Sequence, residues 1–253
     1  MRQRYWLWSV LFAILLSACV SDGFNRGSVS AEEVARSNLE LGREYYRRGQ
    51  YEVALERLRK ATAAQPQDSR IHAMLALTYA QLGDVSQSRY YHRRALQYVE
   101  PDSGEFGEIS NNYGVFLCEN TDYADAEEYF IQAAQSRRYS TPHLAYENAG
   151  YCAEKAGSPQ KAISYYSQAL ELKPDLARSL LAMVRLNIAQ QKYDAANTFL
   201  QRLTPAQADS AEGLWLAARI AKGQGDLPRA REIEQRLKSQ FPTSPWAVQL
   251  AQP

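Results

Sequence analysis

Residues 41–66, with the sequence LGREYYRRGQYEVALERLRKATAAQP, contain the pattern that decides the fold. Gly42 and Ala54 are small residues that would let two antiparallel helices approach closely, and Leu58 supplies the apolar bulk beside them. Pro66 closes the segment, and proline ends a helix because it lacks a backbone donor and clashes with the preceding turn. This stretch therefore predicts a helix–turn–helix pair.

The same pattern returns along the chain. Across six copies, intervals of 34, 38, 36, 34 and 34 residues separate the small residue of the second helix. This column consists of Ala54, Ser88, Ala126, Ala162, Ala196 and Ala230. A column on the first helix keeps the same register and consists of Gly42, Ala76, Gly114, Gly150, Val184 and Ala218. One helix pair cannot bury its apolar face alone, so the copies are expected to stack and share a continuous core.

The residues and their spacing resemble the tetratricopeptide repeat (TPR), with Asn38 replacing the usual Trp. The resemblance implies an all-α fold, a right-handed superhelical solenoid of six TPR helix-turn-helix repeats. The expected repeats are 35–68, 69–102, 107–140, 143–176, 177–210 and 211–244, followed by a C-terminal cap at 245–253. The two longer intervals place extra residues around Ser103–Phe106 and Thr141–Pro142, in turns between repeats, which tolerate insertions.

The N-terminus predicts export and lipid attachment. Arg2 and Arg4 precede an apolar stretch at 5–16. This stretch is shorter than the roughly 20 residues that a membrane-spanning helix needs, and it has the length of the apolar part of a secretory signal. Residues 16–19, LSAC, resemble the lipobox of bacterial lipoproteins, which implies lipidation of Cys19. An ordinary signal segment with an incidental cysteine is the alternative.

Lipidation would divide the chain into a signal peptide at 1–18, a flexible lipid-anchored tether at 19–34 and the TPR domain at 35–253. Val20 stands where inner-membrane retention signals often carry Asp. The resemblance therefore implies a lipid-anchored protein on the periplasmic side of the outer membrane.

Charge and motifs argue against several function classes. The chain has 29 basic and 28 acidic side chains, and loss of Arg2 and Arg4 with the signal peptide would leave a net charge of −1. A near-neutral chain has no strong attraction for nucleic acid. The sequence has no phosphate-binding glycine loop and no known nucleophile–His–acid signature, so we expect no enzyme, no cofactor and no small-molecule substrate. His72 and His92 are expected to be core residues rather than metal ligands, and they could face each other across the helix pair.

Two stretches resemble one particular family of TPR proteins. Residues 111–118, NNYGVFLC, and 147–157, ENAGYCAEKAG, resemble the PilF/PilW family of type IV pilus pilotin lipoproteins. The resemblance covers the lipobox and all six repeats, and is weakest in repeats five and six. It implies a fimbrial assembly factor that binds secretin subunits and promotes their outer-membrane localisation and multimerisation. The alternative is a general periplasmic TPR scaffold lipoprotein that docks envelope proteins such as cell-wall hydrolases.

TPR proteins usually bind partners on the concave face, which the first helices line. The expected protein-binding residues are Arg36, Leu39, Arg43, Tyr46, Met74, Leu77, Asn112, Asn148 and Tyr151, and Trp215 is expected to extend this face. Asn112 and Asn148 occupy equivalent repeat positions and, because an amide both donates and accepts, could hold an extended segment in register. Leu39, Met74 and Leu77 would form an apolar patch on a polar face. Solvated groove residues without a binding role are the alternative.

The two remaining cysteines are predicted to form a disulfide. Cys118 is the twelfth residue of its repeat and Cys152 the tenth of the next, both on first helices. Two positions correspond to about 200° of rotation on a helix, so the two sulfurs would face each other between adjacent parallel helices. An oxidising periplasm would preserve the bond. Two unpaired cysteines that serve as small core residues are the alternative.

Overall fold

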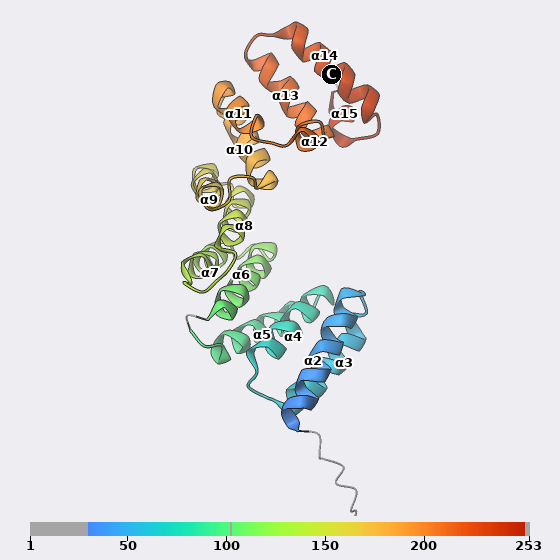
Figure 1. Cartoon of the computed structure of the whole chain (residues 1–253), viewed down its shortest axis with the longest axis vertical. Helices are drawn as coiled ribbons and strands as arrows, with labels where there is room; N and C mark the ends of the chain where they lie inside the picture. The colour runs from blue at the N-terminus through green and yellow to red at the C-terminus, as the bar shows by residue number, and fades with distance from the viewer. Residues whose placement is uncertain (1–29, 102, 251–253) are drawn as a thin grey trace, which may run out of the picture. The chain divides into compact units, whose positions relative to one another are not determined.

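The computed structural model describes residues 30–101 and 103–250 (Figure 1). Within these ranges the regular elements are 14 α-helices and no strands, which confirms the all-helical TPR array. The first helices of the pairs are α2 (Ala31–Arg47), α4 (Ser69–Gln81), α6 (Gly104–Glu119), α8 (Pro142–Lys155), α10 (Ala177–Ala189) and α13 (Ala211–Gly223). The second helices are α3 (Tyr51–Ala64), α5 (Val85–Tyr98), α7 (Tyr123–Gln135), α9 (Pro159–Leu172), α11 (Tyr193–Leu200) and α14 (Leu227–Gln240). Two short helices complete the set, α12 (Pro205–Ala208) and α15 (Pro245–Gln249).

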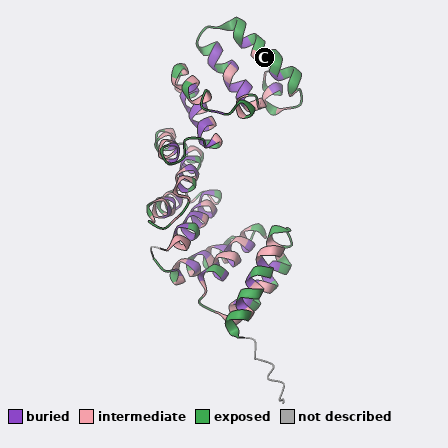
Figure 2. Cartoon of the chain, in the orientation of Figure 1, coloured by how far each residue is buried: buried purple, intermediate pink, exposed green. Residues whose placement is uncertain are grey.

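The described residues form two compact units. One ends at Pro66 and contains the α2–α3 pair, and the other begins at Gln67 and contains α4 to α15. Within each unit, consecutive helices pack as pairs, and in the second unit each pair also packs on the next. Buried residues follow the facing sides of these helices and exposed residues the outer sides (Figure 2).

The small residues of the first helices make the predicted close contacts. A Cβ atom on Gly42 would lie 2.7 Å from a methyl carbon of Leu58. A Cβ atom on Gly150 would likewise lie 2.8 Å from the ring of Tyr166. Because these large side chains are fully buried, the space beside each glycine belongs to the core, and the repeat pattern is a packing pattern.

The turn between the two helices of a pair requires a left-handed residue. Gly49 has φ 72° and Gly157 has φ 69° at this place. The third and fifth repeats lack a glycine there, and Thr121 (φ 67°) and Gln191 (φ 58°) adopt the same conformation. The left-handed backbone conformation is unfavourable for residues other than glycine. Helix packing in these two repeats therefore offsets the strain.

Several local features differ from a uniform repeat. The residues around Ser103–Phe106 were expected to form a turn between repeats. Most of them are helical instead, because Ser103 caps α6 and Gly104 begins that helix. In the fifth repeat, α11 is short and is followed by α12, whose first turn carries a capping box built by Thr204 and Gln207. The hydroxyls of Ser103 and Thr204 therefore start helical turns between repeats at these two places.

The two buried histidines pack against different tyrosines. His72 packs against Tyr91 and Tyr98, with ring centroids 5.8 and 5.2 Å apart. His92 stacks on Tyr113 of α6, with ring centroids 4.9 Å apart. The two imidazoles therefore belong to different aromatic clusters, since one faces its own helix pair and the other faces the next repeat.

The C-terminal helix α15 covers the end of the last repeat. Trp246 packs against Trp215 of α13, with ring centroids 4.6 Å apart. Along residues 30–101 and 103–250, no helix is both long enough and apolar enough to cross a membrane.

Candidate protein-binding site

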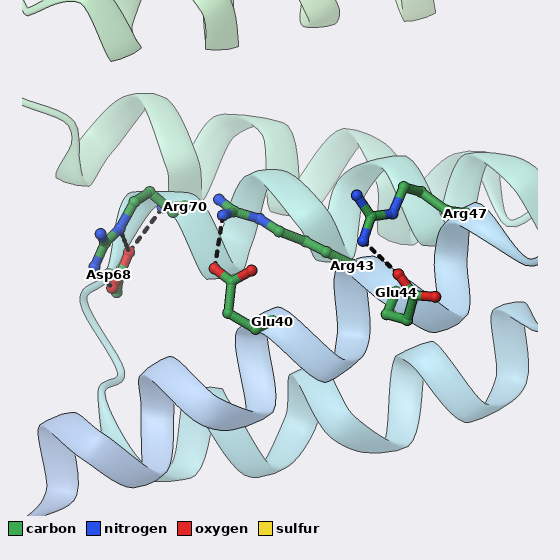
Figure 3. Close-up of polar contacts among 6 residues, drawn as sticks. All are labelled: Glu40, Arg43, Glu44, Arg47, Asp68 and Arg70. Carbon is green, nitrogen blue, oxygen red and sulfur yellow. Dashed lines mark hydrogen bonds and ion pairs between the residues drawn. The ribbon is translucent and has the colours of Figure 1, made fainter.

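The first helix of the first unit presents charged side chains that pair with each other. Arg43 donates to Glu40 over 3.0 Å, and Arg47 pairs with Glu44 one turn further along α2 (Figure 3). Hydrogen bonds from Arg47 and Arg48 lower the pKa of the Glu44 carboxyl below its usual value. These exposed ion pairs leave the charges in water, where a partner can displace them at low cost.

The apolar patch expected on this face is smaller than the sequence suggests. Leu39 is only 3% exposed and is part of the core, so it offers no binding surface. Arg36 is exposed, while Tyr46 is half-buried and lies edge-on to Tyr51 at 5.4 Å between ring centroids. The face of α2 is therefore polar, with paired charges of both signs.

In the second unit, α4 contributes an ion pair and two partly buried apolar residues. Arg70 pairs with Asp68 at 2.6 Å (Figure 3). Burial raises the pKa of the Asp68 carboxyl, but the hydrogen bonds and charge of Arg70 outweigh it and the net pKa is lowered. Met74 and Leu77 are half-buried, so they provide limited apolar contact.

A chain of hydrogen bonds joins three successive first helices. The Asn148 amide on α8 donates through Nδ2 to Oδ1 of Asn111 on α6 over 3.0 Å. The guanidinium of Arg178 on α10 donates to Oδ1 of Asn148 over 2.7 Å. Neighbours on both sides therefore fix the orientation of the Asn148 amide. By donor and acceptor count, one N–H and one lone pair of this amide are left for a ligand.

A buried carboxylate holds Arg178 in place. Glu147 accepts from the Ser179 hydroxyl over 2.6 Å and from the Ser179 backbone N–H over 3.1 Å. Its other oxygen lies 3.0 Å from the Arg178 guanidinium. A buried charge must be paired and hydrogen-bonded to be tolerated, and Glu147 satisfies both conditions. Sequence analysis missed Asn111, Glu147 and Arg178, although Arg178 stands at a repeat position that often faces the groove.

Tyr151 is the most exposed of the expected binding residues of this unit. Its side chain is 46% exposed, and two cations flank the ring: Lys155 Nζ at 5.8 Å and Arg178 Cζ at 6.0 Å from its centroid. An exposed aromatic ring with cations beside it and an oriented amide one turn away is a surface suited to a peptide side chain and backbone.

A hollow of about 470 Å³ lies beside this chain of hydrogen bonds. It is lined by Gly104, Glu108, Asn111, Asn112, Tyr139, Ser140, Thr141 and Leu144. Asn112 lines the hollow, whereas Asn148 is not among its lining residues and is bonded to Asn111. The two asparagines at equivalent positions therefore have different surroundings. One lines a hollow and the other belongs to a hydrogen-bonded chain.

The last repeat contributes less to this face than expected. Trp215 is only 8% exposed because Trp246 covers it, so the expectation that it lines the groove is wrong. Arg219 instead lies over the Trp215 ring, with its Cζ atom 4.8 Å from the centroid. Arg185 pairs with Glu212 at 2.6 Å and thereby ties α10 to α13.

Cys118 and Cys152 are joined by a disulfide, with their Cα atoms 5.7 Å apart. The bond links α6 to α8 across a sequence separation of 34 residues. The Asn111–Asn148 hydrogen bond joins the same two helices, nearer the start of each. Two independent links therefore fix the helices that carry the candidate site.

Two further expectations concern metal and lipid. In the two ranges that the structure describes, no three His, Cys, Asp or Glu residues gather as a metal site would require. Cys19, the expected lipid attachment point, lies outside the described residues.

Comparison with known proteins agrees with this architecture. Three models described as tetratricopeptide repeat match residues 39–105, 105–175 and 153–220. The type IV pilus assembly protein PilF of Pseudomonas aeruginosa is 27% identical over 237 residues, which cover 92% of each chain.

Solved structures extend the likeness to three dimensions. A structure of Pseudomonas aeruginosa PilF superposes with a TM-score of 0.74 at 26% identity and covers 87% of this chain and 98% of PilF. PilW, described as a widely conserved type IV pilus biogenesis factor, gives a TM-score of 0.73 at 27% identity over 87% of this chain and 99% of PilW. The chain is a tetratricopeptide-repeat protein related to the PilF/PilW type IV pilus assembly proteins.

Proposed function

We propose that this chain is an outer-membrane pilotin lipoprotein that binds secretin subunits and promotes their localisation and multimerisation during type IV pilus assembly. The observation that carries the proposal is the extent of the likeness to PilF, which covers 92% of both chains. TPR arrays serve many unrelated functions, so a few matching repeats would not support a specific role. A likeness that extends through all the repeats supports a shared role.

The proposed binding surface is the face of α6, α8 and α10 that carries Asn112, Asn148 and Tyr151. Asn111 and Arg178 already hold the Asn148 amide, so a bound segment would not have to order it. Binding to groups that are already ordered loses less conformational entropy. An extended segment of the secretin would pair its backbone with the free edge of this amide and place a side chain against Tyr151.

The proposed membrane attachment is through lipidated Cys19. Residues 19–34 would form the tether between lipid and repeats. Lipidation with several acyl chains gives lasting attachment, whereas a single chain gives only marginal binding. Attachment would place the binding face where secretin subunits enter the outer membrane.

A binding measurement with paired tyrosine variants tests the surface. Tyr151→Ala removes the exposed ring on α8, and Tyr90→Ala removes a ring that is 52% exposed on the second helix α5. We expect Tyr151→Ala and Asn148→Ala each to weaken secretin binding by about tenfold or more, as truncation at an interface centre does. Tyr90→Ala should leave the affinity unchanged.

The same experiment separates the alternatives. Normal secretin binding by both the Asn148 and the Tyr151 variant would remove this face from the site. Failure of the intact chain to bind secretin, together with capture of cell-wall hydrolases from solubilised envelopes, would favour the general scaffold.

A further inference from the structure

The two cysteines of the Cys118–Cys152 disulfide have different surroundings. Both cysteines are only 3% exposed and belong to one apolar cluster with Tyr113, Leu117 and Phe130. Cys152, but not Cys118, also lines a cavity of about 200 Å³. One cysteine of the bond therefore borders a cavity, and the other does not.

The cavity lies between α7, α8 and α9. Its lining residues are Tyr123, Ala124, Glu127, Ala149, Cys152, Ala153, Ala156, Ser158, Lys161 and Tyr165. Four of these are alanines, which leave the volume unfilled. None belongs to α6, the helix that carries Cys118. The cavity thus approaches Cys152 from helices other than the one to which it is bonded.

Polar groups line part of the cavity. The Lys161 ammonium lies 2.7 Å from the Glu127 carboxylate, and the Tyr165 hydroxyl donates to the same carboxylate. Burial raises the pKa of Glu127, but the hydrogen bonds from Lys161 and Tyr165 outweigh it and the net pKa is lowered. A volume of 200 Å³ corresponds to about six water molecules, which is room for a small organic thiol but not for a protein loop.

We propose that this cavity admits low-molecular-weight thiols to the disulfide and that Cys152 is the sulfur they modify. Displacement at sulfur needs the attacking atom opposite the leaving sulfur, and the cavity provides an approach to Cys152 from the side away from α6. The thiolate RS⁻ forms a bond to Cys152 Sγ as the Sγ–Sγ bond breaks. Cys118 leaves as a thiolate and takes up the proton that RSH had lost. The products are a mixed disulfide at Cys152 and a free thiol at Cys118, with no net oxidation or reduction.

The consequence is a disulfide that small thiols open without unfolding of the protein. A thiol on another protein cannot enter a cavity of this size, so its reaction has to wait for local opening of the repeats. The link between α6 and α8 would then respond to the concentration of small thiols, and Cys152 would be the site of S-thiolation.

The test follows the reaction of the folded, full TPR chain with 2-mercaptoethanol and with reduced thioredoxin. The reaction is stopped with iodoacetamide, and mass spectrometry of the peptides locates the products. We expect the 2-mercaptoethanol adduct on Cys152 and the carbamidomethyl group on Cys118. The rate should rise linearly with 2-mercaptoethanol concentration, while thioredoxin should react slowly at a rate independent of its concentration.

A matched pair of variants tests the route. Ala156 is an exposed cavity-lining residue at the end of α8, and Ala189 is an exposed residue at the end of α10 outside the cavity. Ala156→Phe should slow the reaction with 2-mercaptoethanol roughly tenfold by restricting access, and Ala189→Phe should not. Circular dichroism would establish that both variants keep the fold.

Three results would overturn the proposal. Adducts divided equally between the cysteines would show that Cys152 has no preferred access. An unchanged rate in a folded Ala156→Phe variant would exclude the cavity as the route. A rate that saturates with 2-mercaptoethanol at the value seen with thioredoxin would mean that unfolding, and not entry into the cavity, limits the reaction.

Discussion

Burial of His92 makes stability depend on pH. It stacks on Tyr113 and lies 5.3 Å from Phe116 between ring centroids, and neither ring nitrogen has a hydrogen-bond partner within the described residues. Burial lowers its pKa to about 3. In the unfolded chain the imidazole has its usual pKa of about 6.5. The unfolded state therefore binds more protons than the folded state between these two values, and acid favours unfolding.

The first prediction is that stability falls as the pH falls from about 6.5 towards 3, and that His92→Phe removes much of this dependence. The contribution of His92 between pH 7 and pH 5 should be about 2 kcal/mol, from the linkage relation. Urea unfolding at several pH values measures it. The control His143→Gln changes a histidine in the first turn of α8 and should keep the slope of the intact chain. An equal slope in the His92→Phe variant would contradict the assignment.

The second prediction concerns the glycine of the third repeat. A Cβ atom on Gly114 would lie 2.8 Å from the ring of Phe130, so Gly114→Ala should overpack the helix pair and destabilise it by about 1–3 kcal/mol. Gly114→Ala with Phe130→Leu should lose less stability than the sum of the two single changes, because the smaller side chain makes room. Additive losses in urea unfolding would show that the two residues do not compete for space.

Residue-scale features were only partly predictable from sequence. The repeat pattern predicted the contact of Gly42 with Leu58, because one register sets both positions. Exposure was harder to predict. Leu39 and Trp215 stand at repeat positions that usually face the groove, yet Leu39 is buried in the core and Trp246 covers Trp215. The position of a residue within the repeat predicts where its side chain points. It does not predict whether another side chain covers it.

Between elements, the contact of α6 with α8 carries the covalent link near the candidate site. The disulfide and the Asn148–Asn111 hydrogen bond both join these helices, and the Arg178–Asn148 hydrogen bond continues to α10. Rigid neighbouring helices hold a binding site more exactly than loops do. The disulfide should therefore matter for binding as well as for stability.

The third prediction is that replacement of both cysteines, Cys118→Ala with Cys152→Ala, destabilises the chain by roughly 3–4 kcal/mol in the chain-entropy model. Hydrogen exchange should increase most in α6, α7 and α8, because they flank the lost link. Non-reducing peptide mapping of the intact protein after export to the periplasm should recover the two cysteines as one linked pair. Recovery of both as alkylated free thiols would contradict the disulfide.

Helix order was predictable, and helix ends were less so. The 34-residue periodicity identified each pair, but the start of α6 and the extra turn α12 depend on local capping. The hydroxyls of Ser103 and Thr204 accept hydrogen bonds from the first turn of these helices. A single capping residue is harder to recognise in a sequence than a position that recurs in every repeat. The hydrogen-bonded chain through Asn148 was harder still to predict from sequence, because it joins side chains from three repeats.

At the scale of the whole molecule, the likeness to PilF and PilW extends over nearly the full chain. The proposed role also requires attachment to the membrane. The fourth prediction is that Cys19→Ala yields a folded protein that is lost from the outer-membrane fraction, because the acyl chains supply the attachment. Density-gradient fractionation and immunoblotting would detect the change. Continued outer-membrane fractionation of the variant, with normal secretin assembly, would mean that the lipobox assignment is wrong or that another contact suffices.

The most direct test of the central claim is the state of the secretin in a strain that lacks this chain. Inner and outer membranes are separated, and secretin monomers and heat-resistant multimers are immunoblotted in each. We predict loss of multimers from the outer membrane on deletion, recovery with the intact chain, and weaker recovery with Tyr151→Ala than with Tyr90→Ala. Normal multimers in the outer membrane of the deletion strain would contradict a role as secretin pilotin.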